Sequence, residues 1–258
     1  QDSWVKAADG TSVIAGRIEK MSKSKRNVVD PETIIESFGA DTARLFMLSD
    51  SPPERDMEWT ESGVEGASRF LRRIFQMAQD PELAPIGSEV SPDSEGSAFA
   101  LIRMAHKSII AMSTDIENFR FNRAVAQLHI LANTISDVQP ADYGAAAAKR
   151  FGVETLAQLL SPLSPHIAEE MWEILGHETM LAATEWPTAD ETLANDDDVE
   201  IGVQVNGKLR DTIKLPRDCE TSEAKAKALE LPAVLRYLDK RAPKKVIVVK
   251  NRIINVVV

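Results

Sequence analysis

Cysteine is nearly absent from this sequence, which contains a single one, Cys219, among 258 residues. One cysteine excludes an internal disulfide framework. Its neighbours Asp218 and Glu220 are acidic and no histidine lies near it in the sequence, so we expect an incidental thiol rather than a nucleophile. No hydrophobic run approaches the length of a membrane-spanning helix, and we expect no signal peptide. The expected location is therefore the cytoplasm, without membrane contact.

Several common patterns of catalytic and cofactor sites are also missing. The sequence has no glycine-rich nucleotide-binding pattern and no cluster with zinc-ligand spacing. The histidines His106, His129, His166 and His177 show neither metal spacing nor a paired nucleophile, so we expect packing or surface roles for them. No metal site is expected in this chain.

The most informative feature that is present is the loop Lys20-Met21-Ser22-Lys23-Ser24. It places two ammonium groups three positions apart, with hydroxyl groups between and beside them. Lysine is a compact point charge with three rotatable donors, which suits negative charge that moves between an α-phosphate and a leaving pyrophosphate. The pattern therefore predicts a loop that closes over a triphosphate. The alternative is a solvated loop in which lysine and serine gather by chance.

The residues after this loop predict a compact helical support. Asp30-Pro31 is a helix start, because the carboxylate caps free N–H groups and proline is preset for the first turn. Gly39 ends that helix. A second helix follows at once, and Asp41 is its expected cap.

The central part of the chain predicts a helical bundle. Apolar residues recur there at three- and four-residue spacings, which is typical of amphipathic helices. The expected helices cover 64–77, 99–116, 121–138, 141–160 and 164–176. We expect them to pack as an antiparallel bundle, with a long loop over 80–97 and an acidic linker over 187–198.

Residues 199–258 predict a separate small α+β domain of order β-β-α-α-β-β. Asn206-Gly207 is a strong two-residue hairpin turn between alternating strands. Cationic side chains gather at the expected turns and strand ends: Lys208, Arg210, Lys244, Lys245, Lys250 and Arg252. Long cationic side chains at such places reach phosphates across a folded RNA. The alternative is that they protect exposed strand edges from aggregation.

The net charge of −10 is unevenly distributed along the chain. Residues 1–26 carry a net charge of +3, residues 27–198 of −19 and residues 199–258 of +6. Attraction to phosphate acts within about 10 Å at ordinary salt concentrations. The acidic surplus of the middle therefore leaves both ends free to meet phosphate.

Six segments together resemble a known family of enzymes. They are KMSKSKRNVVDP at 20–31, GADTARLFM at 39–47, SPPERDMEW at 51–59, GVEGA at 63–67, SPLSPHIAEEMW at 161–172 and VQVNGKLR at 203–210. They resemble class I aminoacyl-tRNA synthetases and, among these, the bacterial-type leucyl-tRNA synthetases. Relatives for isoleucine or valine usually carry Gly-Asn soon after the lysine loop and lack the Ser-Pro-Pro-Glu segment. The resemblance covers nearly the whole chain.

The resemblance implies that 20–24 is the ATP-binding KMSKS loop, with Lys20 and Lys23 as catalytic residues and Lys23 stabilising charge in the transition state. ATP with Mg²⁺ is the implied cofactor, and leucine and tRNA(Leu) are the implied partners of a monomeric ligase. The chain begins at Gln1 without methionine and lacks a His-Ile-Gly-His ATP signature. We therefore expect a C-terminal fragment, inactive alone, whose leucine pocket and editing domain lie upstream.

The resemblance also implies a division into domains. Residues 1–60 would end the catalytic domain with the loop and stem-contact helices, 61–186 would form an anticodon-binding-type bundle, 187–198 a linker, and 199–258 a tRNA-binding domain. In the bundle, Arg69, Arg72 and Arg73 fall within little more than one turn, which makes them candidates for contact with the tRNA backbone. A solvated helix face is the alternative for these arginines.

Two other functions remain open at this point. One is a non-catalytic tRNA-binding module derived from a class I synthetase, against which the intact lysine loop argues. The other is a sister synthetase for isoleucine, valine or methionine. The segment 51–59 and the hairpin at Asn206-Gly207 speak against that one.

Overall fold

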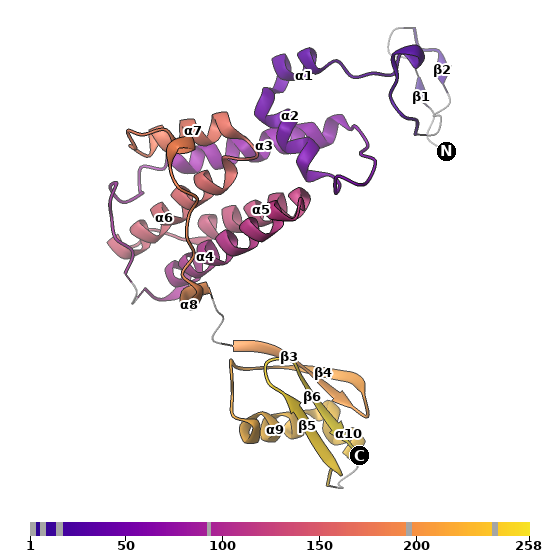
Figure 1. The fold of residues 1–258 in the computed structure, drawn as a ribbon, viewed down its shortest axis with the longest axis vertical. Coiled ribbons are helices and arrows are strands. Elements are labelled where there is room, and N and C mark those ends of the chain that lie inside the picture. Colours follow the sequence, from indigo (N-terminus) through magenta and orange to yellow (C-terminus); the bar gives the residue numbers. More distant parts are fainter. Residues whose placement is uncertain (1–3, 6–8, 14–17, 92–93, 195–197, 239–241) are drawn as a thin grey trace. The chain divides into compact units, whose positions relative to one another are not determined.

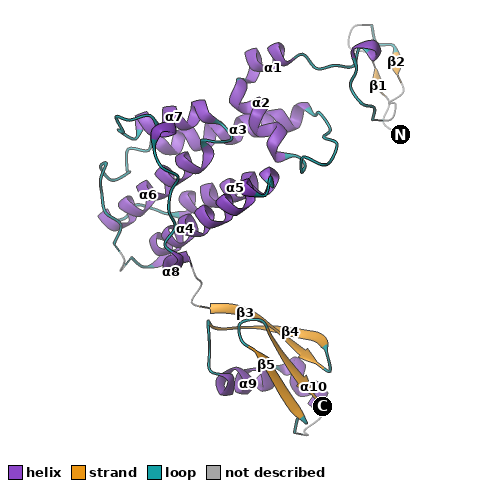
Figure 2. Cartoon of the chain, viewed as in Figure 1, coloured by secondary structure: helices purple, strands orange, loops and turns teal. Residues whose placement is uncertain are grey.

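The computed structural model describes residues 4–5, 9–13, 18–91, 94–194, 198–238 and 242–258. The chain forms two compact units, Gln1–Asp190 and Glu191–Val258 (Figure 1). The first is mainly helical, and the described part of the second combines a sheet with three helices (Figure 2). Within the described residues, no helix has both the length and the apolar character needed to cross a bilayer.

Seven α-helices and the lysine loop make up most of the described first unit. Its helices are α1 (Pro31–Phe38), α2 (Ala40–Ser49), α3 (Glu61–Ala78), α4 (Gly96–Glu117), α5 (Phe121–Asp137), α6 (Tyr143–Leu160) and α7 (Pro165–Ile174). Before α1 lie a short strand pair, β1 (Trp4–Val5) and β2 (Ser12–Val13), and the 3₁₀ turn η1 (Lys23–Lys25). A second 3₁₀ turn, η2 (Leu181–Ala183), follows α7.

Local signals in the sequence set several helix starts. Asp30 caps α1 by accepting a hydrogen bond from the backbone N–H of Glu32, and Gly39 ends that helix with φ of 84°. Asp142 caps α6 in the same way, because its Oδ1 accepts from the N–H of Ala145 at 2.7 Å. The helices expected from the apolar spacing are confirmed. A loop was expected over 80–97; its described residues up to Glu95 join α3 to α4, α4 begins at Gly96, and residues 92–93 lie outside the described part.

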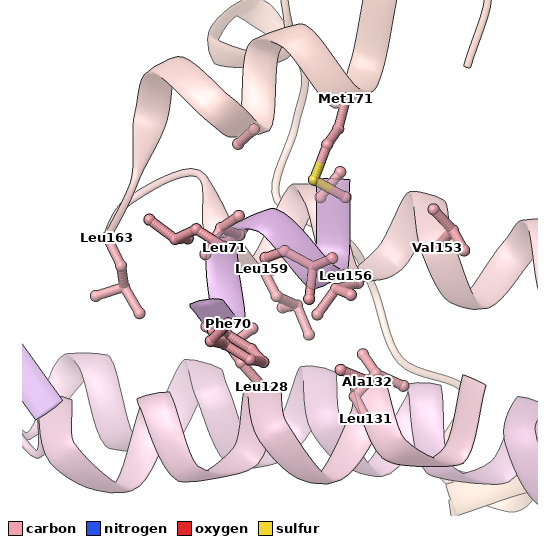
Figure 3. Close-up of a cluster of buried hydrophobic side chains, with 14 of the residues drawn as sticks. Phe70, Leu71, Leu128, Leu131, Ala132, Val153, Leu156, Leu159, Leu163 and Met171 are labelled. Carbon is pink, nitrogen blue, oxygen red and sulfur yellow. The ribbon is translucent and has the colours of Figure 1, made fainter. Parts of the chain in front are cut away.

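The core of the first unit gathers the apolar faces of α3 to α7. Phe70 and Leu71 of α3 lie among side chains of α5, α6 and α7 (Figure 3). Ile74, Leu128 and Leu156 are completely buried. α2 packs against α3 and α5, so the helices after the lysine loop belong to the same packed unit. Packing therefore continues across residue 60, where a functional boundary was expected.

The second unit begins with α8 (Glu191–Ala194), within the stretch expected to be a linker, of which residues 195–197 lie outside the described part. Its other elements are β3 (Asp198–Val205), β4 (Lys208–Pro216), α9 (Thr221–Glu230), α10 (Pro232–Leu238), β5 (Lys245–Val249) and β6 (Ile253–Val257). Asn206 and Gly207 adopt φ of 50° and 79°, as a type I′ hairpin turn requires.

The sheet of the second unit has the strand order β4-β3-β6-β5. β3 pairs with β4 and β5 with β6 in antiparallel fashion, while β3 and β6 run parallel. Val203 of β3 and Ile254 and Val256 of β6 are fully buried and pack with Ala228 of α9 and Val234 of α10.

Candidate functional site

The lysine loop is folded by its own polar side chains. Ser22 caps η1, since its Oγ accepts a hydrogen bond from the N–H of Lys25 at 3.3 Å. Asn27 holds the other side, because its Oδ1 accepts from the N–H of Ser22 at 2.8 Å and its Nδ2 donates to the carbonyl of Lys20 at 3.4 Å. The serines therefore shape the turn, and Asn27 is a contributor that the pentapeptide pattern does not reveal.

The cations of this loop differ in their partners. Lys25 Nζ lies 2.6 Å from Glu19 Oε2. Lys20 and Lys23 are exposed, and neither makes an ion pair or a side-chain hydrogen bond with any residue in the described part of the chain. The two lysines predicted to be catalytic are thus the ones whose ammonium groups are available for a phosphate ligand.

Asp41 does not cap its own helix. Gly39 is the residue before α2, so Asp41 lies inside the first turn and its carboxylate points to another helix. Oδ2 accepts a hydrogen bond from the N–H of Ile167 at 2.7 Å, and Oδ1 lies 2.9 Å from His166 Nδ1. The expected cap of α2 is therefore a cap of α7, supplied from about 125 residues away.

The arginines of α3 have different surroundings. Arg69 is exposed and its Nη1 lies 3.5 Å from Glu65 Oε2. Arg72 is also exposed and donates to Ser68 Oγ at 2.9 Å. Arg73 is only partly exposed and ties α3 to α5.

The contacts of Arg73 all lie within the first unit. It donates to Asn133 Oδ1 at 2.8 Å, to Ser136 Oγ at 2.9 Å and to the carbonyl of Ala132 at 3.3 Å. A phosphate contact by Arg73 would compete with these bonds, whereas Arg72 faces a groove. That groove has a volume of about 640 Å³ and lies between the start of α2, the second half of α3 and the start of α7.

In the second unit, strand direction sorts the six predicted cations into two sets. The start of β4, the end of β6 and the start of β5 lie at one end of the sheet, because β3 and β6 are parallel and the outer strands run against them. That end carries Lys208, Arg210, Lys244 and Lys245. Lys250 and Arg252 belong to the turn between β5 and β6, at the opposite end. All six are exposed.

Two of these cations also contact their own unit. The guanidinium of Arg210 lies 4.4 Å from the centre of the Tyr237 ring, and Lys244 Nζ donates to the carbonyl of Val258 at 3.4 Å. Stacking on the ring leaves the edge of the Arg210 guanidinium open to solvent. The structure therefore brings four of the six cations to one end and separates the other two.

The histidines and Cys219 were expected to have packing, surface or incidental roles. His177 stacks on Trp172 with 3.5 Å between ring centres, and burial lowers the pKa of His106, an effect that the nearby Asp190 partly offsets. Desolvation and then Glu223 raise the pKa of Cys219, which keeps this thiol protonated at neutral pH. The described residues contain no group of three side chains able to hold a metal ion.

Comparisons with known proteins place these features in one family. Residues 10–60 match the family model "tRNA synthetases class I (I, L, M and V)", and residues 100–225 match "Anticodon-binding domain of tRNA ligase". The leucine–tRNA ligase of Rhodospirillum rubrum is 54% identical over 97% of this chain, and that of Paramagnetospirillum magneticum 48% identical over 98%. The chain belongs to the leucine–tRNA ligase family. It spans about 29% of the length of each of these two relatives.

A solved member of the leucine–tRNA ligase family has the same fold. The agnB2 LeuRS of Agrobacterium radiobacter K84, in a ternary complex with tRNA and LeuAMS, superposes with a TM-score of 0.81 at 30% identity. The match covers 92% of this chain and 31% of that one. The family resemblance expected from the lysine loop and the segments after it is thereby confirmed.

Proposed function

We propose that this chain is the C-terminal part of a leucine–tRNA ligase, to which it contributes the ATP-binding lysine loop and the surfaces that hold tRNA. The observation that carries the proposal is that this chain, a member of the family, holds two lysine ammonium groups of the loop exposed and without partners among the described residues. Lys20 and Lys23 are held on a turn shaped by Ser22 and Asn27, and their ammonium groups have no partner among the described residues. They are available to phosphate oxygens.

In the proposed reaction, the leucine carboxylate attacks the α-phosphate of ATP, the bond to pyrophosphate breaks, and leucyl adenylate forms. A terminal hydroxyl of tRNA(Leu) then takes the leucyl group and AMP leaves. Lys23 stabilises the negative charge that builds on the departing pyrophosphate, and Lys20 and the serines keep the loop closed over it. ATP would bind as its Mg²⁺ complex, and the lysine ammonium groups of this chain would contact the same phosphates.

The tRNA would be held by both units. On α3, Arg69 and Arg72 are the proposed phosphate contacts, whereas Arg73 would first have to give up its bonds to α5. In the second unit, one end of the sheet supplies four cations, among them Lys208 on β4 and Lys245 on β5. Contacts of this kind position an RNA without reading its sequence.

The test of the function is leucine-dependent exchange of pyrophosphate with ATP by the intact ligase. Leucine is expected to drive exchange, and isoleucine, valine and methionine to drive it far less. The isolated chain is expected to show no exchange, because it holds only the lysine side of the nucleotide site. An intact protein that binds tRNA(Leu) but never exchanges pyrophosphate would favour the non-catalytic binding module instead.

Removing residues 199–258 from the intact ligase is expected to weaken tRNA(Leu) binding and to flatten its salt dependence. Each lost phosphate contact lowers the slope of log affinity against log salt by about 0.7 to 0.9. Binding is measured between 50 and 200 mM salt, conditions over which such contacts matter strongly. Affinity and slope unchanged after the truncation would show that the second unit does not hold tRNA.

Two matched double variants sharpen this test. Lys208→Ala with Lys245→Ala removes two charges from the clustered end of the sheet, and Lys250→Ala with Arg252→Ala removes two from the other end. We expect the first pair to reduce the salt slope more than the second. The reverse order would move the proposed contact to the β5–β6 turn.

A further inference from the structure

A polar latch joins the helices that follow the lysine loop to the start of α7. We propose that Asp41 and Arg44 are positioning residues, which fix the lysine loop relative to the tRNA-binding helices by holding α2 against the segment 162–167. This inference rests on the proposed function. The inference gives a role to Asp41 and Arg44, which contact neither ATP, leucine nor tRNA in the proposed function.

The carboxylate of Asp41 holds the first turn of α7. It is 9% exposed, and it accepts from the N–H of Ile167 at 2.7 Å while its other oxygen lies 2.9 Å from His166 Nδ1. The backbone carbonyl of Asp41 also accepts from Ser164 Oγ, at 3.3 Å. A negative charge at a helix N-terminus is stabilised by the unpaired N–H groups there.

Arg44 holds the residues just before that turn. Its Nε donates to the carbonyl of Leu163 at 3.1 Å and its Nη2 to the carbonyl of Pro162 at 3.0 Å. These carbonyls belong to the connection between α6 and α7. One turn of α2 thus places an anion at the start of α7 and a cation on the connection before it.

The path from this latch to the lysine loop is short. Residues 27–30 join η1 to α1, and α1 runs through Gly39 directly into α2. On its other side, the latch borders the groove lined by Arg72, His166 and Ile167. The position of a tRNA bound at α3 relative to the lysine loop therefore depends on where α2 lies. The latch is the polar contact that holds α2 against α7.

The test compares two aspartates that cap helices in the intact ligase. Asp41 caps α7 from a distant helix, and Asp142 caps α6 locally at the same 2.7 Å. We expect Asp41→Ala to lower the urea midpoint more than Asp142→Ala, because Asp41 is buried and also contacts His166, whereas Asp142 is exposed. Both variants are expected to leave tRNA-independent pyrophosphate exchange nearly unchanged. Only Asp41→Ala and Arg44→Met are expected to lower kcat/KM for charging tRNA(Leu), by about tenfold.

Equal losses of tRNA charging in Asp41→Ala and Asp142→Ala would show that Asp41 acts only on stability, and unchanged charging in Asp41→Ala would also overturn the proposal. If Asp41→Ala fails to fold, Asp41→Asn takes its place, because the amide keeps an acceptor for the N–H of Ile167. The Asp41→Asn variant is expected to lower kcat/KM for charging tRNA(Leu) by a smaller factor than Arg44→Met. Absence of leucine activation in the unmodified ligase would instead contradict the proposed function.

Discussion

Replacing Lys23 by methionine in the intact ligase is expected to slow leucyl-adenylate formation by a factor of about 100 to 1,000, the usual effect of losing one preorganised donor to transition-state charge. The ammonium group of Lys23 has no partner among the described residues, so the folded loop loses no contact that the structure shows. Methionine keeps most of the side-chain length. Leucine affinity is expected to stay nearly constant, because Lys23 acts on phosphates rather than on the amino acid.

Lys25→Met is the matched control for this variant. Lys25 belongs to the same turn, but its ammonium group is already paired with Glu19 at 2.6 Å. We expect its replacement to slow adenylate formation by less than about tenfold, through the shape of the loop alone. Equal losses in the two variants, or a loss of leucine affinity as large as the loss of rate, would assign Lys23 a simple binding role.

Arg150→Met is expected to lower the free energy of unfolding of the first unit by about 3 to 5 kcal/mol, the usual cost of removing one partner from a buried ion pair. Arg150 is 7% exposed, and its guanidinium donates to the carbonyls of Ala84 and Leu175 and to Glu154 Oε1. Without it, the two carbonyls lose the donor that Arg150 supplies, and Glu154 keeps its contact with His177. Urea unfolding of the chain, followed by helical circular dichroism, measures the loss.

The network around Arg150 supplies the controls. In the Arg150→Met background, Glu154 has lost its arginine partner and keeps its contact with His177 Nε2 at 3.0 Å. Glu154→Gln removes the carboxylate charge there and is expected to restore part of the stability. Arg69→Met, which removes an exposed cation from α3, is expected to change stability little. A loss for Arg150→Met no larger than that for Arg69→Met would contradict the structural role given to Arg150.

Much of the helical unit was predictable because its signals are local. Apolar side chains spaced for a helix, such as Ile74 and Leu128, become core residues wherever the helix packs. The caps Asp30 and Asp142 bind N–H groups two and three residues away, within reach of a sequence pattern. The fold of the lysine loop is also local, because Ser22 and Asn27 shape it from within, but the contacts of Asn27 were not part of the sequence prediction.

Contacts between distant segments were not predictable from the sequence. Asp41 precedes apolar helical residues just as Asp142 does, yet its carboxylate serves α7. The N-cap of α2 is Gly39, two residues before Asp41, so Asp41 lies inside the helix and does not cap it. In the sequence, nothing distinguishes Arg150 from an exposed cation of an alanine-rich helix. Its role depends on the carbonyls of Ala84 and Leu175, which come from distant segments.

The sorting of the second unit's cations also depends on a distant contact. Each hairpin is visible in the sequence, whereas the parallel pairing of β3 with β6 joins segments about 50 residues apart. This pairing places the start of β4 and the start of β5 at the same end of the sheet. It therefore separates Lys208 and Lys245 from Lys250 and Arg252.

The most direct measurement is the rate constant of leucyl-adenylate formation in a single turnover, at saturating ATP and leucine, for the intact ligase and its Lys23→Met variant. Saturation removes differences in binding, so the ratio reports the stabilisation that Lys23 gives to the transition state. A rate constant lower by about 100-fold or more, with leucine dissociation unchanged, is the predicted result. Equal rate constants for the two proteins would show that the lysine loop does not act on the transferred phosphate.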